Sequence, residues 1–429
     1  MQLNIPRETI RTFEGSVANH TNAEQQLRRS VMSCMLWERE FYEDGVSIST
    51  RIKNLIPKVH PAKVAEIARF AKNEMKLRHT PLWIVCCMAG VHTHKQFVSS
   101  LLFDIIQRPD ELSEFLAMYW KDEKKPISAQ IKKGLASAFT KFNAYSLAKW
   151  NKDGAIKLRD VLFLCHAKAK DAEQSELWKQ LINNELPVPD TWEVALSSGA
   201  DKKESWERLL GEKKLGALAL LRNLRNMQEV NVDKNLIASS LQSIKVDKVL
   251  PFRFISAARF APHLEPYLEE AMFKCIADKN KLKGKTNLLI DVSGSMGSPI
   301  SSKSDMTRFD AACGLAVLAR ELCEEVEVYT FSQSLVGVPL RRGFALRDAI
   351  LNSQPHSSTY LGAAVERLSN YDRLIVFTDE QSHDQVSKPK GKGYMINVAS
   401  AKNGVGYGAW NHIDGFSEAV FDFICEVEK

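Results

Sequence analysis

Near the start of its last third, the chain reads Thr286-Asn287-Leu288-Leu289-Ile290-Asp291-Val292-Ser293-Gly294-Ser295-Met296-Gly297. Its apolar run, Leu288 to Ile290, is typical of a strand that is buried on both faces. The run ends abruptly at Asp291, and two spaced serines and two glycines follow. Open α/β sheets bind their ligands at the carboxyl ends of strands. We therefore expect a ligand site where this strand ends.

The polar residues at this point are hard oxygen donors on a turn that glycine permits. Such donors suit Mg²⁺ or a similar divalent cation, which takes about six ligands, so other strand-end loops must contribute. The two candidates are Thr359 and Asp379, and Asp379 ends a second apolar strand as Asp291 ends the first. The alternative is that Asp291 and the serines only cap a turn and the following helix. The predicted metal ligands are Asp291, Ser293, Ser295, Thr359 and Asp379.

Strand and helix patterns alternate throughout residues 284–429. This alternation predicts a doubly wound, largely parallel α/β sheet. The predicted strands are Leu288–Asp291, Val326–Phe331, Leu374–Thr378 and Tyr394–Val398. The predicted helices are Arg308–Cys323, Ala345–Leu351, Gly362–Leu368 and Glu418–Glu426.

Residues 1–283 have a different pattern, a series of amphipathic helices without a convincing strand. Short polar joints separate these helices, and Pro61 and Pro81 stand where a first helical turn tolerates proline. Many such helices in series predict stacked helix pairs, as in α-solenoids, although no fixed sequence period names the repeat. The first twenty residues are either a strap or a frayed end.

Charge also separates the two parts. The whole chain carries +6; residues 284–429 hold 14 Lys and Arg against 18 Asp and Glu, or −4, which leaves +10 for residues 1–283. A basic helical part predicts a polyanionic partner. Eight cysteines without a disulfide pattern, no signal peptide and no apolar run longer than Pro81–Val91 predict a cytoplasmic protein.

One basic stretch, residues 132–168, interleaves cations with aromatic rings. Cations for phosphates beside flat rings for unpaired bases are the composition of an RNA-binding surface. The alternative is that these charges only solvate helix faces. The predicted RNA-binding residues are Lys133, Lys141, Lys149, Trp150, Lys152, Arg159, His166 and Lys168.

The segment Leu289–Met296, together with Thr359 and Asp379, resembles a von Willebrand factor A domain with its metal-ion-dependent adhesion site. The resemblance implies that the five predicted ligands hold the ion. It also implies that the ion bridges to an acidic group of a ligand and performs no chemistry.

Several motifs of the helical part resemble the TROVE domain of Ro ribonucleoproteins, and the length suits a short bacterial-type member. The motifs are Lys76-Leu77-Arg78-His79-Thr80-Pro81-Leu82, Asp110-Glu111-Leu112 with Tyr119-Trp120-Lys121, Lys133-Gly134-Leu135-Ala136 with Phe139-Thr140-Lys141-Phe142, and Lys157-Leu158-Arg159-Asp160-Val161-Leu162 with His166-Ala167-Lys168. That family joins a ring of HEAT-like helical repeats to a von Willebrand A domain, in the order expected here for residues 1–283 and 284–429.

The Ro resemblance implies two modes of RNA binding. Small noncoding Y RNA is expected on an outer basic surface, where Lys149 and His166 match the family's residues, and single-stranded 3′ ends of misfolded RNA in a central hole. The chain departs from the family at Lys152 and Asp153, near which the family has an arginine.

The leading hypothesis is therefore a non-enzymatic ribonucleoprotein for RNA quality control or scaffolding, with a 3′ exoribonuclease as a further partner. The alternative is a metal-dependent protein-interaction scaffold that engages an acidic partner. A metal-dependent hydrolase is disfavoured, because no general base is paired with the site. A zinc site at Cys86, Cys87, His92 and His94 is also disfavoured, because adjacent helical cysteines point in different directions.

Overall fold

The computed structural model describes residues 9–32, 45–246, 249–277, 279–300, 306–399, 401, 403–415, 420–421, 424–425 and 428. In these residues a helical part precedes an α/β part, as the sequence predicts. Contacts divide the chain into two compact units: unit 1 comprises Met1–Ile48 and Leu210–Lys429, and unit 2 comprises Ser49–Leu209. Unit 2 therefore interrupts unit 1 in the sequence.

Unit 2 is built from helices that pack against their neighbours in the chain. Pairs such as α3 with α5, α4 with α6, and α5 with α7 are in contact. Gly134 allows α7 to approach α5 closely, because a Cβ atom there would lie 2.8 Å from a methyl of Leu102. The helices are α3 (Pro61–Asn73), α4 (His79–Ala89), α5 (Lys95–Ile105), α6 (Asp110–Tyr119), α7 (Ala129–Phe139), α8 (Ala144–Trp150), α9 (Leu158–Cys165), α10 (Ala172–Asn183) and α11 (Trp192–Ser197), and the division between the units passes through α2 (Gly45–Leu55) and α12 (Lys202–Gly211).

Unit 1 contains a six-stranded sheet in the order β3-β2-β1-β4-β5-β6. All neighbouring strands are parallel except β2 and β3. The four predicted strands are present. The strands β3 and β6 were not predicted, because β3 is a four-residue edge strand with a glycine and three of the four residues of β6 are polar. The strands are β1 (Leu282–Asp291), β2 (Cys323–Phe331), β3 (Leu335–Val338), β4 (Arg373–Thr378), β5 (Lys392–Asn397) and β6 (Asn411–Asp414).

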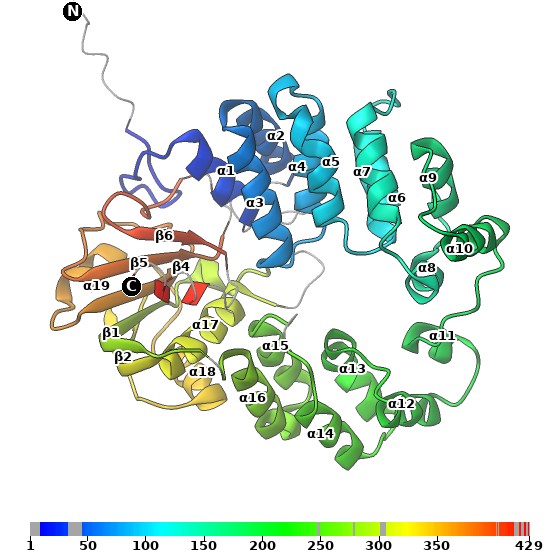
Figure 1. The fold of residues 1–429 in the computed structure, drawn as a ribbon. Helices are drawn as coiled ribbons and strands as arrows, with labels where there is room; N and C mark the ends of the chain where they lie inside the picture. Colours follow the sequence, from blue (N-terminus) through cyan, green and yellow to red (C-terminus); the bar gives the residue numbers. More distant parts are fainter. Residues whose placement is uncertain are drawn as a thin grey trace, which may run out of the picture. The chain divides into compact units, whose positions relative to one another are not determined.

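Helices cover both faces of this sheet, as expected for a doubly wound fold (Figure 1). Leu289 of β1 packs in one apolar cluster with α19 (Leu361–Arg367), and α17 (Arg308–Leu322) also contacts β1. Because alternate strand residues point to opposite faces, Leu288 and Ile290 are directed away from that cluster. All three side chains are fully buried, as their apolar run predicts.

Helices that precede the sheet in the sequence pack against helices that follow its first strand. The helix α15 contacts α17, and Arg259 of α15 forms an ion pair with Asp310 of α17. The predicted domain boundary at 283/284 marks the change in sequence pattern and stays a prediction. Contacts place residues 210–283 in the same unit as the sheet. These helices are α13 (Ala217–Glu229), α14 (Lys234–Gln242), α15 (Phe252–Phe260) and α16 (Glu265–Phe273), and α18 (Gly343–Leu351) follows β3.

Of the two alternatives for the first twenty residues, the described residues 9–20 form a strap, and residues 1–8 lie outside the described residues. Arg11 and Val17 form a short bridge, and α1 (Ala23–Met32) contacts β6 at the far end of the sequence. The segment is therefore attached to β6, the edge strand of the sheet. Most of the predicted helix Glu418–Glu426 lies outside the described residues, as does Cys34.

Candidate functional site

Two acidic residues lie at the carboxyl ends of neighbouring strands. Asp291 is the last residue of β1, and Asp379 directly follows β4. The two strands are parallel partners, with Ile290 opposite Phe377. Parallel pairing therefore brings the two carboxylates to the same edge of the sheet, as the sequence predicts.

Asp291 is fully buried and is held by two hydrogen bonds. Its carboxylate accepts from the Ser293 amide at 2.9 Å and from the Thr378 hydroxyl at 2.6 Å. Burial, and then the nearby charge of Asp379, raises the pKa of Asp291 to about 7. A cation bound here would remove this penalty on the ionised form.

Asp379 contacts both a serine and an arginine. The Ser295 hydroxyl donates to Asp379 Oδ2 at 2.6 Å and lies 3.3 Å from the Ser293 hydroxyl. The Arg308 guanidinium, 2% exposed, lies 3.3 Å from the same carboxylate oxygen. Sequence reasoning missed Arg308, because only the tertiary fold brings α17 to the end of β4.

Thr359, the fifth predicted ligand, lies in a segment attached to this site. The carbonyl of Ser357 accepts from the Gly294 amide at 3.0 Å. The amide of Thr359 donates to His383 Nδ1 at 3.1 Å, and its carbonyl accepts from the His383 amide at 2.8 Å. Thr359 is therefore fixed between the turn after β1 and the loop after β4.

The donors of this site fit a hard cation. Two carboxylates and three hydroxyls are oxygen ligands of the kind that Mg²⁺ prefers, and Mg²⁺ usually retains several waters. No group of three or more His, Cys, Asp or Glu side chains suited to a metal occurs in the part of the chain that the structure describes. A cation held here would therefore have only two protein carboxylates, and the metal site stays a prediction.

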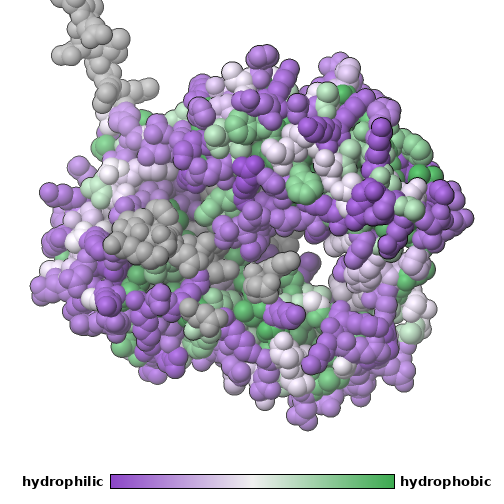
Figure 2. All heavy atoms as spheres, in the orientation of Figure 1, coloured by the Kyte–Doolittle hydropathy of each residue, from purple (hydrophilic) through white to green (hydrophobic). Residues whose placement is uncertain are grey.

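The predicted RNA-binding residues lie together in unit 2, within or next to α7, α8 and α9. Each is at least partly accessible at the surface. On the face drawn in Figure 2, the surface over these helices carries many hydrophilic side chains with a few hydrophobic ones between them. His166 ends α9 in a left-handed conformation, with φ of 54°, and is exposed.

Trp150 is the centre of a cation–aromatic cluster. The Arg108 guanidinium lies 3.8 Å from the centre of the indole ring, and the Lys149 and Lys152 ammonium groups lie at 5.6 and 5.3 Å. Asp110 orients Arg108 by accepting from its Nε at 3.0 Å. Arg108 lies 42 residues before Trp150 in the sequence, and so the basic stretch alone did not identify it.

A second cation–aromatic pair extends this surface. The Lys141 ammonium lies 4.6 Å from the centre of the Phe103 ring, which is 42% exposed. Burial lowers the pKa of Lys141 from its usual value. Two further rings, Tyr145 and Phe163, are 51% and 60% exposed and are available for stacking. We call Trp150, Phe103 and the cations around them the cation–aromatic surface.

Unit 2 also contains a half-open cavity of about 480 Å³. Two aromatic rings, Trp83 and Tyr119, and two lysines, Lys53 and Lys125, are among its lining residues. The disfavoured zinc residue Cys87 lines the cavity too, and burial raises the pKa of its thiol to about 12. A protonated thiol is a poor metal ligand, which favours packing over zinc binding.

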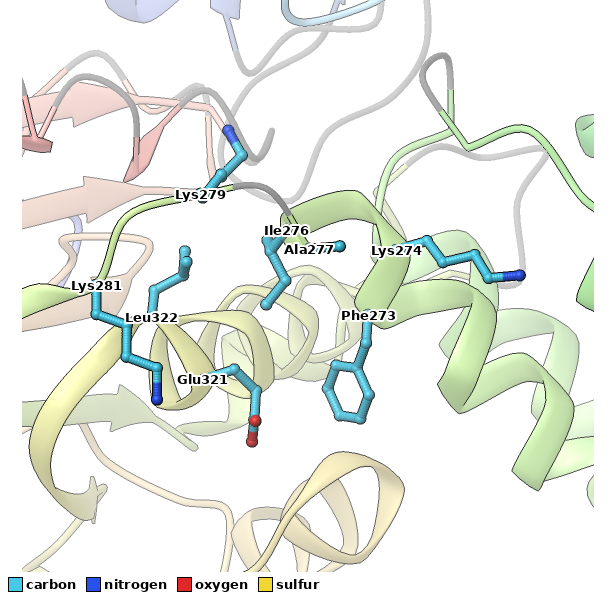
Figure 3. Close-up of a pocket in the computed structure, with 8 residues that line it drawn as sticks. All are labelled: Phe273, Lys274, Ile276, Ala277, Lys279, Lys281, Glu321 and Leu322. Carbon is cyan, nitrogen blue, oxygen red and sulfur yellow. The ribbon is translucent and has the colours of Figure 1, made fainter.

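A basic pocket of about 360 Å³ lies in unit 1 beside α16 and α17. Three lysines line it, Lys274, Lys279 and Lys281, but their side chains point in different directions (Figure 3). Glu321, also in the lining, pairs with Arg342 at 2.6 Å. The three cations do not converge on one anion, and so we do not assign a ligand to this pocket.

Comparison with known proteins identifies part of the chain directly. Residues 183–289, from the end of α10 to β1, match the family described as the TROVE domain. The crystal structure of the Deinococcus radiodurans Ro (RSR) protein superposes with a TM-score of 0.58 and 16% identity, over 92% of this chain and 97% of that one. Residues 183–289 are therefore similar to a TROVE domain, and the chain has the fold of a Ro protein.

Curated relatives of this protein match over a shorter span. Telomerase protein component 1 from mouse is 35% identical over 89 residues, and its rat counterpart is 34% identical over 89 residues. These matches include 19% of this chain and only 3% of the relatives' length. The predicted Ro resemblance is thus confirmed, whereas the von Willebrand A, metal-binding and HEAT assignments stay predictions.

The cation–aromatic surface lies before the matched TROVE residues in the sequence.

The seven described cysteines are all free thiols. No helix among the described residues is both long and apolar enough to cross a bilayer.

Proposed function

We propose that this protein binds RNA through the cation–aromatic surface of unit 2. The observation that carries the proposal is the arrangement around Trp150, where three cations surround one indole ring. Lysine and arginine neutralise phosphates, and an aromatic ring stacks with unpaired bases. The TROVE domain and the Ro fold support a ribonucleoprotein of the RNA-binding class.

The RNA that we propose is a small structured noncoding RNA of the Y RNA type, with single-stranded 3′ ends of misfolded RNA as a second ligand. The protein would act by capture and not by chemistry, in RNA quality control or as a scaffold. Delivery to a 3′ exoribonuclease would complete this role. The free cysteines support a reducing compartment, and we propose the cytoplasm.

A salt titration tests the RNA claim. Labelled structured RNA, with or without a single-stranded 3′ tail, is titrated with the protein at rising salt concentration. If four to eight phosphates are contacted, the logarithm of the affinity should fall against log[salt] with a slope of about −3 to −7. Absent or salt-insensitive binding would overturn the proposal.

Paired replacements test whether two binding modes exist. Replacing Lys149 and His166 together should weaken the structured RNA more than a tail-only RNA. The matched control is Lys202→Met, which removes one positive charge from an exposed position of α12. An equal loss for both RNAs would contradict the two modes.

A second function is favoured by the site at the ends of β1 and β4. We propose that Asp291, Ser293, Ser295, Thr359 and Asp379 hold Mg²⁺, and that a partner's carboxylate completes the coordination. The observation behind it is that Asp291 and Asp379 lie at the ends of paired parallel strands, with the Ser293 amide bonded to the first carboxylate and the Ser295 hydroxyl to the second. A partner captured only with Mg²⁺, lost in Asp291→Ala and resistant to nuclease would support this scaffold function.

A further inference from the structure

Asp379 and Glu380 are consecutive buried carboxylates that pair with arginines from two different helices. Arg308 of α17 contacts Asp379 at 3.3 Å, and Arg29 of α1 contacts Glu380 at 2.5 Å. Both carboxylates are fully buried, and Arg29 is 1% exposed. Glu380 has a φ of 62°, in the left-handed region that non-glycine residues rarely adopt. The backbone therefore turns at Glu380, and the side chains of Asp379 and Glu380 contact different helices.

Arg29 is fixed by more than this ion pair. Its guanidinium donates from Nε and Nη2 to the carbonyl of Ala401, at 3.3 and 3.2 Å. His412 contacts both members of the ion pair, because its Nε2 lies 2.5 Å from Glu380 Oε1 and 3.0 Å from Arg29 Nη1. Arg29 therefore fastens α1 to the loop after β4 and to the segment before β6.

Residues before α1 also form hydrogen bonds to the loop after β4. We call this loop, residues 379–384, the metal loop. The Thr12 hydroxyl donates to the carbonyl of Ser382 at 2.9 Å. The Phe13 amide donates to the Gln381 side chain at 2.8 Å, and the Ser16 hydroxyl donates to the carbonyl of Asp384 at 2.5 Å. Successive residues of the metal loop are therefore bonded to one N-terminal segment.

The metal loop connects this segment to two of the predicted metal ligands. Asp379 is its first residue, and the amide of Gln381 donates back to Asp379 Oδ1 at 3.3 Å. The Ser382 hydroxyl donates to the carbonyl of Thr359 at 3.2 Å. Displacement of the loop would therefore move Asp379 and Thr359 together.

We propose that residues 12–29 form a latch that holds the metal loop in the position a divalent cation requires, with Arg29 as its main positioning residue. The inference rests on the metal site proposed above. Ligand geometry depends on the groups that orient the ligands, and replacing such outer groups typically weakens metal binding. Arg29 touches no predicted metal ligand and acts only through Glu380 and the loop.

The unit offers a matched control for Arg29. Arg373 is also a buried arginine paired with a glutamate, Glu428, but it is the first residue of β4 and lies at the opposite end of that strand from Asp379. Arg29→Met and Arg373→Met both remove a buried cation of unit 1. Only the first removes a contact of the metal loop.

Hydrogen–deuterium exchange of the full chain tests the latch without added metal. In Arg29→Met the amides of residues 379–384 should exchange at least fivefold faster, whereas in Arg373→Met they should exchange at the wild-type rate. Unchanged exchange in Arg29→Met, or equal acceleration in both variants, would overturn the latch.

Calorimetric titration with Mg²⁺ tests its effect on the cation. The dissociation constant should rise at least fivefold in Arg29→Met and less than twofold in Arg373→Met. If the wild type binds no Mg²⁺, the metal site and the cation role of the latch are both refuted. Exchange then decides only whether residues 12–29 hold the loop.

If Arg29→Met fails to fold, a milder pair of variants tests the latch instead. Thr12→Val removes one buried hydroxyl that contacts the metal loop, and Thr286→Val removes one that accepts from Arg373 at 2.8 Å. Faster loop exchange in Thr12→Val alone would support the latch. Equal behaviour of the two valine variants would refute it.

Discussion

The metal-site edge of unit 1 and the cation–aromatic surface of unit 2 use charged residues in opposite ways. At the metal-site edge, Asp291, Asp379 and Arg308 are at most 2% exposed, and each has a fixed polar partner. On the cation–aromatic surface, Lys152 remains exposed and lies over the ring of Trp150.

This difference in burial indicates which kind of ligand each region suits. A buried charge is costly without its partner, and so it fixes geometry. An exposed lysine keeps its hydration and counterions and can exchange them for a phosphate. The first arrangement suits a small ion, and the second suits a long polyanion.

The largest expected effect comes from breaking a buried pair in unit 1. Arg29→Met and Arg373→Met should each lower the free energy of unfolding by about 3–5 kcal/mol, because each removes the arginine of a buried ion pair. Lys63→Met breaks a pair that is 50% and 53% exposed, and it should change stability by less than about 0.5 kcal/mol. Urea denaturation of the three variants measures the contrast. Similar losses in all three would remove the distinction between buried and exposed ion pairs.

A pH experiment sharpens the same contrast through Glu428. Burial alone would raise its pKa, but hydrogen bonds from Arg373, Lys392 and Tyr394 lower it to about 2. A lowered pKa means that the pair stabilises the fold above about pH 4.5, and that this contribution is lost as the pH falls towards 2. Glu428→Gln should therefore cost on the order of 2–3 kcal/mol at pH 7 and almost nothing at pH 2. Thermal melting across this range measures it, and a pH-independent cost would contradict the assignment.

On the cation–aromatic surface, the ring matters more than any single charge. Trp150→Ala should weaken RNA binding by about 1–3 kcal/mol, because stacking with a base is lost. Trp150→Phe keeps an aromatic face and should lose less than Trp150→Ala. Filter binding at fixed salt measures both, and equal losses would mean that Trp150 supports the fold without touching RNA.

The smallest effect concerns the competition of protons with the cation at Asp291. Burial and the charge of Asp379 raise the pKa of Asp291 to about 7, and a metal ligand must be deprotonated. Mg²⁺ affinity should therefore be about tenfold lower at pH 6 than at pH 8. Calorimetric titration at the two pH values measures this, and a pH-independent affinity would show that Asp291 is ionised throughout.

The sequence predicted the central strands and their strand-end acids, because a fully apolar run that ends in a carboxylate is a local pattern. It could not predict that Arg308 contacts Asp379 or that Arg108 covers Trp150. Each pair joins residues far apart in the sequence, and nothing in the local pattern of either partner indicates the other. The same reason hid the role of the N-terminal strap, whose patterning is weak and whose partners are 368 to 370 residues away.

The discontinuity of unit 1 has a consequence for biosynthesis. Unit 2 consists of one continuous segment, Ser49–Leu209, and can begin to fold as soon as that segment leaves the ribosome. Arg29 must wait for Glu380 and the strands around it, and at typical rates of synthesis this delay is about 20–70 s. During that interval an isolated arginine-bearing helix at the start of the chain is exposed to other partners. A chain that stops before β4 lacks Glu380, and so its Arg29 would never form this ion pair.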